Sequence, residues 1–61
     1  MRVELIINEI RERRTSKSTY IASGACKDYV EYQHICGAIR ELTILEDIIL
    51  DTLRKEENSD D

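Results

Sequence analysis

The pattern of apolar residues in the second half of the chain predicts one long helix with two apolar sides. Over residues 29–56 apolar side chains recur at steps of three and four, the spacing of one helix face. This main stripe consists of Tyr32, Ile35, Ile39, Leu42, Ile49 and Leu53. A second group, Ile44, Leu45 and Ile48, lies roughly opposite, because a helix turns by about 100° per residue. A helix that is apolar on two sides needs two packing partners.

The first part of the chain carries a shorter apolar stripe. It consists of Val3, Ile6, Ile7 and Ile10 and predicts a helix over residues 2–14. The same face continues onto Arg14, Lys17 and Ile21, so that charged residues replace apolar ones. Four of residues 15–19 are Ser or Thr, which are poor helix formers because their hydroxyls compete for backbone groups. A helix that ends at 14 and one that continues to 22 both remain possible.

The clearest break between the two helices is Ser23-Gly24, because glycine readily adopts the left-handed conformation that closes helices. Asp28, followed three residues later by Glu31, resembles an N-terminal capping pair for the second helix. A short connection makes neighbouring helices antiparallel. We therefore expect an all-α antiparallel helical hairpin with a short first and a long second helix. Residues 1–57 form its single domain and residues 58–61 a polar tail.

The packing of this hairpin follows from the two stripes. The first-helix stripe should meet the later part of the second helix, which contains Ile49, Leu50 and Leu53. Glu46 lies on the apolar stripe, where a charge is costly unless it is paired. Arg14 and Lys17 are suitable partners, and the alternative is a bent side chain that reaches solvent. Gly37 indicates either close helix approach or a tolerated weak position.

Composition and charge narrow the class of protein. The chain has 61 residues, no proline and 41% hydrophobic residues, so it is at most one small helical domain. A net charge of −4 argues against a general nucleic-acid binder. The charge is uneven, with basic residues within 11–27 and acidic ones within 41–61. This asymmetry indicates head-to-tail contact between copies, docking on an acidic partner, or simply two solvated faces.

The candidate chemical sites are sparse, so we expect neither an enzyme nor a bound metal or cofactor. Cys26 and Cys36 are ten residues apart, about 15 Å along one helix, which is too far for a disulfide within the chain. We expect buried thiols, with a bridge between two chains as the alternative. His34 and Cys36 diverge by about 200° on a helix and cannot both bind one ion. One histidine does not supply a nucleophile, base and acid set. No membrane-spanning run or signal peptide is visible, which indicates an intracellular protein.

The segments Ala25–Gln33 and Ile35–Leu42 resemble a pattern in small helical proteins of tailed bacteriophages. In that pattern a lysine, aspartate and aromatic residue at the end of a loop lead through Glu-Tyr to a glycine. A helix follows in which an apolar residue, a charged residue, any residue and a leucine come in that order. The resemblance covers residues 26–53 and departs from the pattern at Cys36 and at Leu42-Thr43. It implies a small virion-associated or accessory protein, located in the host cytoplasm or the virion.

The second apolar group predicts self-association into a dimer or a larger helical oligomer. The predicted interface residues are Ile44, Leu45, Ile48, Tyr29 and Tyr32. These features favour a non-enzymatic protein–protein assembly component, for example a small phage virion protein. Two alternatives remain open. One is a helical regulator or inhibitor that binds a single host or phage protein. The other is a nucleic-acid-binding accessory protein that uses the basic residues Arg11, Arg13, Arg14 and Lys17.

Overall fold

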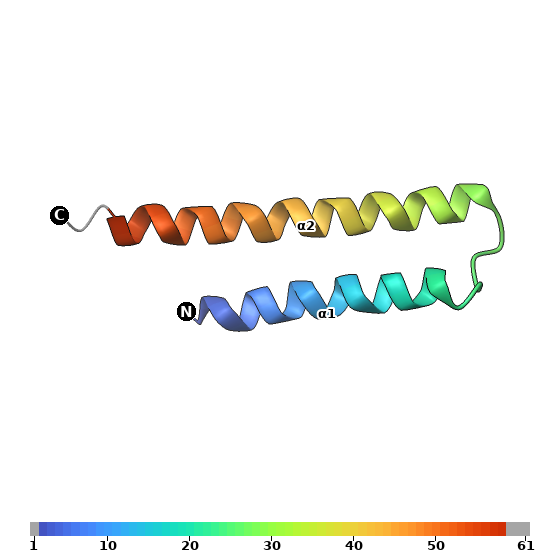
Figure 1. Ribbon diagram of the computed structural model, residues 1–61, viewed down its shortest axis with the longest axis horizontal. Coiled ribbons are helices and arrows are strands. Elements are labelled where there is room, and N and C mark those ends of the chain that lie inside the picture. The colour runs from blue at the N-terminus through green and yellow to red at the C-terminus, as the bar shows by residue number, and fades with distance from the viewer. Residues whose placement is uncertain (1, 59–61) are drawn as a thin grey trace.

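The computed structural model describes residues 2–58 and contains two helices that contact each other. Helix α1 spans Val3–Ala22 and helix α2 spans Tyr29–Asn58. Both lie side by side, and residues 23–28 join them at one end of the molecule (Figure 1). This arrangement confirms the all-α, hairpin-like prediction for the described part of the chain. Of the predicted polar tail, Asn58 belongs to α2 and residues 59–61 lie outside the described residues.

Helix α1 takes the longer of the two courses that the sequence allows. It continues through the hydroxyl-rich segment 15–19 and ends at Ala22. Poor intrinsic propensity is a weak preference that packing against a neighbouring helix overrides. The extra turns give α1 and α2 a longer line of contact, although α2 still extends past α1 at both ends (Figure 1).

The connection ends one helix and starts the next as predicted. Gly24 has a φ of +77°, and its amide donates to the Ile21 carbonyl at 3.1 Å. This left-handed conformation is accessible to glycine at little cost. The Oδ1 atom of Asp28 accepts from the backbone amide of Glu31 at 2.9 Å, which confirms Asp28 as the N-cap of α2.

The apolar core is small. Ile7 and Ile10 are the buried hydrophobic residues of the described chain, at 7% and 5% exposed. The α2 stripe residues Ile35, Ile39 and Leu42 are half-buried. The radius of gyration is 15.0 Å, compared with about 10.5 Å for a compact domain of this length. The hairpin is therefore an elongated unit with a single line of helix contact.

At three positions the structure differs from what the sequence pattern predicts. Ile6 is 36% exposed and Tyr32 43% exposed, although both fall on predicted apolar stripes. Ile6 lies toward the edge of the α1 stripe, and Tyr32 lies near the start of α2. At such positions a single neighbouring helix covers little of a side chain. A Cβ atom placed on Gly37 would meet no described atom within 4 Å. Close helix approach is therefore wrong for Gly37 within this chain, and a tolerated weak position remains.

Candidate protein-protein interface

A charge cluster lies inside the contact between α1 and α2. Nε of Arg11 donates to Oε2 of Glu46, and Nη1 of Arg14 donates to Oε1, each at 2.6 Å. The Glu46 side chain is only 9% exposed, whereas those of Arg14 and Arg11 are 28% and 53% exposed. Both carboxylate oxygens therefore have a charged donor, and Glu46 does not extend into solvent. The hydrogen bonds from Arg11 and then Arg14 lower the pKa of the Glu46 carboxyl, against a smaller opposing effect of desolvation.

The observed partners of Glu46 differ in part from those that the sequence indicates. Arg14 is one of the two predicted residues, and its Nη1 atom also donates to Oγ1 of Thr43 at 3.3 Å. Lys17 does not take part: the second partner is Arg11. The reason is distance along the helix axis, because Lys17 lies about 4.5 Å beyond Arg14 toward the connection.

The sequence contained a signal for Arg11 that stripe-based reasoning does not use. Arg11 lies to one side of the α1 stripe and reaches Glu46 with its long side chain. Residues three apart on a helix are surface neighbours, so Arg11 and Arg14 present two cations on adjacent positions. A buried carboxylate can accept from both.

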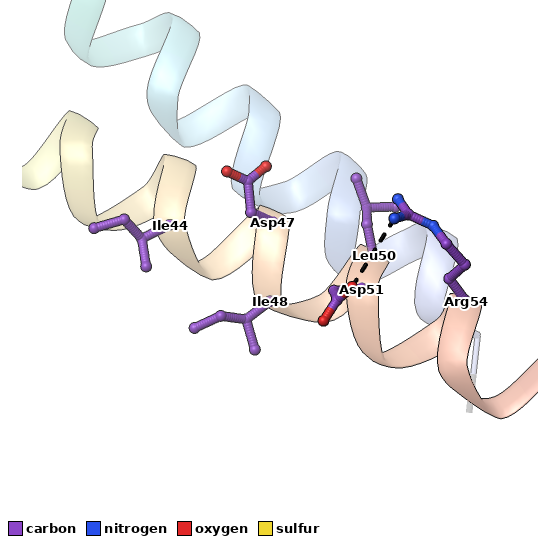
Figure 2. A pocket seen from close by; sticks show the side chains of 6 residues that line it. All are labelled: Ile44, Asp47, Ile48, Leu50, Asp51 and Arg54. Carbon is purple, nitrogen blue, oxygen red and sulfur yellow. Dashed lines mark ion pairs between the residues drawn. The ribbon is translucent and has the colours of Figure 1, made fainter.

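Away from the charge cluster, three aliphatic side chains of α2 are about half exposed. Ile44, Leu45 and Ile48 are 44%, 46% and 55% exposed. Figure 2 shows Ile44 and Ile48 pointing away from α1. We call Ile44, Leu45 and Ile48 the outer face of α2. Its half-exposed aliphatic residues fit the prediction that α1 covers only one side of the long helix.

Two shallow surface hollows flank Ile48. The first is lined by Ile44, Asp47, Ile48, Leu50, Asp51 and Arg54 (Figure 2). At its edge Nη1 of Arg54 lies 3.9 Å from Oδ1 of Asp51. The second is lined by Val3, Ile48, Ile49, Thr52, Leu53 and Glu56. Ile48 therefore forms a ridge between two hollows with charged residues at their margins, a shape that a second helix can pack against.

The two predicted interface tyrosines lie elsewhere, near the start of α2. Tyr29 and Tyr32 are 69% and 43% exposed, and their rings are stacked with centroids 6.2 Å apart. Tyr32 precedes Ile44 by twelve residues, about 18 Å along the axis. The five predicted residues thus form two separate exposed patches, one of aliphatic and one of aromatic side chains.

The remaining candidates do not assemble into a site in the part of the chain that the structure describes. Cys26 and Cys36 are free thiols. The described residues contain no group of three or more His, Cys, Asp or Glu side chains that could hold a metal ion. Neither described helix is long and apolar enough to cross a membrane.

Comparison with protein-family models, with curated proteins and with solved structures finds no match.

Proposed function

We propose that the protein is a non-enzymatic assembly component that associates with copies of itself through the outer face of α2. The observation that carries this proposal is the half-exposed group Ile44, Leu45 and Ile48. Of these, Ile44 and Ile48 point away from α1 (Figure 2). Contiguous exposed aliphatic residues on a small domain mark contact surfaces more often than scattered ones do.

The energetic argument compares this face with the core of the hairpin. Full burial of one large aliphatic side chain contributes about 1.5–3 kcal/mol. The outer face is roughly half exposed, so covering its three residues would contribute about 2–4 kcal/mol in all. That amount is substantial for a hairpin whose own core contains only Ile7 and Ile10 as buried hydrophobic residues among those described.

The proposal also includes finer features. The unit is an antiparallel hairpin, repeated in a helical oligomer. The resemblance of residues 26–53 to small tailed-phage proteins supports a virion or the host cytoplasm as its location. Recovery of the protein in many copies per purified particle would be the corresponding observation. A stoichiometric complex with one enzyme would instead indicate a regulator, and salt-sensitive DNA binding would indicate a nucleic-acid accessory role.

Sedimentation of two matched variants tests the proposal. Ile48→Glu changes an outer-face residue that is 55% exposed, and Leu5→Glu changes a residue of α1 that is 57% exposed. Both substitutions add one negative charge and remove one exposed aliphatic side chain. We expect the wild-type chain and Leu5→Glu to form a larger species in analytical ultracentrifugation, and Ile48→Glu to shift toward the monomer. The double variant Ile44→Glu/Ile48→Glu should shift further.

The same experiment can contradict the proposal. Circular dichroism first establishes that each variant is helical, so that a smaller species is a folded one. A wild-type chain that sediments as a folded monomer from micromolar to millimolar concentration would show that self-association is wrong.

A further inference from the structure

Three residues with complementary properties follow one another at heptad spacing along the exposed side of α2. Glu41, Ile48 and Lys55 are seven residues apart, two helical turns, so they lie on one line. All three are exposed. Lys55 pairs within its own helix with Asp51, Nζ to Oδ2 at 3.2 Å. Ile48 thus lies midway between an anionic and a cationic residue.

We propose that a second copy of the chain docks on this line with its α2 running in the opposite direction, centred on Ile48. Glu41 of each copy then faces Lys55 of the other. This inference rests on the proposed self-association and adds its geometry. The four helices form a layer with the two α2 helices at its centre, because α1 occupies the opposite side of α2.

The exposed area of the hairpin fits one additional interface. The chain exposes 4983 Å², whereas a monomeric protein of 7.1 kDa typically exposes about 4,100 Å². The difference is roughly 900 Å² per copy. A standard protein–protein interface buries about 800 Å² on each partner. One contact with a second copy would bring the exposed area per chain to that of an ordinary folded protein.

The charge pattern selects the direction of the second helix. In a parallel pair Glu41 would face Glu41 of the second copy, and Lys55 would face Lys55. Like charges opposite each other are destabilising. In the antiparallel pair the symmetry axis at Ile48 produces the Glu41–Lys55 contact twice. The line of residues is therefore self-complementary, as an interface between identical copies with twofold symmetry requires.

Two of the three outer-face residues, Ile44 and Ile48, fit the same register. In an antiparallel pair centred on Ile48, Ile44 faces Thr52 of the second copy and packs beside its Ile48. Thr52 turns its hydroxyl to its own helix, since Oγ1 donates to the Ile48 carbonyl at 2.8 Å. Its methyl group is left to contact Ile44. Ile44 and Ile48 thus lie near the centre of the contact and the charged residues Glu41 and Lys55 at its ends, which resembles the apolar core and polar rim of protein interfaces generally.

Charge reversal tests the direction. Glu41→Lys and Lys55→Glu each place like charges opposite each other at both ends of the antiparallel contact. We expect either substitution to weaken the dimer by roughly five- to thirtyfold in Kd. The double variant Glu41→Lys/Lys55→Glu should recover wild-type association, because it restores both contacts with their signs exchanged. Glu12→Lys and Lys27→Glu make the same changes in net charge at exposed positions off this line and should leave Kd within about twofold.

Chemical crosslinking provides a second measurement with a different readout. In a chain with Cys26→Ser and Cys36→Ser, Ile48→Cys should crosslink to itself with a short bismaleimide. Single variants Glu41→Cys and Lys55→Cys should crosslink when they are mixed and not when each is alone. Leu5→Cys should remain uncrosslinked at the same concentration.

These outcomes separate the geometry from the function. If Ile48→Glu dissociates the wild-type oligomer but the double charge reversal does not recover it, self-association stands and the antiparallel register is wrong. Self-crosslinking of Glu41→Cys alone would likewise overturn the register. A wild-type chain that stays monomeric overturns both proposals. The partner of the outer face would then be a different protein.

Discussion

Glu46 is held between the two helices, with its Oε1 atom 2.6 Å from Nη1 of Arg14. The Glu46 residue is only 7% exposed, as little as the core residue Ile7. A buried carboxylate is tolerated because Arg14 and Arg11 each donate to one of its oxygens. Apolar contacts between two helices are compatible with several registers. The two ion pairs to Glu46 form in only one register of α1 against α2. We infer that the charge cluster sets the register between α1 and α2.

The lowered pKa of Glu46 predicts loss of stability in acid. In the folded chain the pKa lies below its ordinary value of about 4.5, to which it returns on unfolding. The stabilisation is therefore complete above about pH 4.5 and is lost as the pH falls through the folded-state pKa. We expect Glu46→Gln to unfold at a lower temperature than the wild-type chain at pH 7, by a difference that shrinks as the pH falls.

The measurement is thermal unfolding followed by circular dichroism at several pH values and one protein concentration, since association changes the apparent stability. Glu9→Gln is the matched control. Glu9 pairs with Arg13 at 2.9 Å, but both side chains are more than half exposed. Such a pair contributes little. A pH dependence of the same size in Glu9→Gln would contradict a special role for Glu46.

Arg14 and Lys17 provide a second test of the cluster. Both lie on the α1 stripe, and only Arg14 contacts Glu46. Arg14→Met should lower the melting temperature by about 4–8 °C, because Glu46 retains only one charged donor. Lys17→Met removes the same charge without breaking an observed ion pair and should leave the melting temperature unchanged or raise it slightly. Equal losses in the two variants would show that net charge, not the Glu46 contact, determines the effect.

Much of this fold could be predicted from the sequence because its signals are local. Gly24 and Asp28 marked the ends of the helices, and both have the geometry that their residue types favour. The extent of α1 was not predictable in this way. Residues 15–19 have poor helix propensity, and only packing against α2 decides that the helix continues through them.

The site was predictable only in part, for two physical reasons. Arg11 was missed because a long side chain reaches positions away from its own helix face. The outer face of α2 was recognised because apolar periodicity reveals which apolar residues a single neighbouring helix leaves partly exposed. Periodicity does not reveal which molecule provides that neighbour, so self-association remains a proposal that depends on the sedimentation of Ile48→Glu.

The N-cap of α2 gives a prediction for the connection. Asp28→Ala removes the acceptor for the Glu31 amide and should destabilise the hairpin by about 1 kcal/mol, or about 4–8 °C in melting temperature. Asp28→Asn or Asp28→Ser should retain most of the stability. Asp47→Ala is the control, because it removes an exposed aspartate from the interior of α2, where alanine is the better helix former. If Asp28→Ala were no worse than Asp47→Ala, the cap would contribute nothing.

Substitution by alanine should change the stability of the hairpin in opposite directions at the two glycines. A Cβ atom would meet nothing within 4 Å in the described chain at either Gly24 or Gly37, so steric overlap does not distinguish them. Backbone conformation does. Gly24 has a φ of +77°, and Gly24→Ala should cost about 1–2 kcal/mol. Gly37 lies within α2, and Gly37→Ala should stabilise the hairpin by about 0.5–1 kcal/mol. Urea unfolding of both variants at one concentration provides the comparison. A destabilised Gly37→Ala would mean that another chain packs closely against Gly37, outside the contact proposed around Ile48.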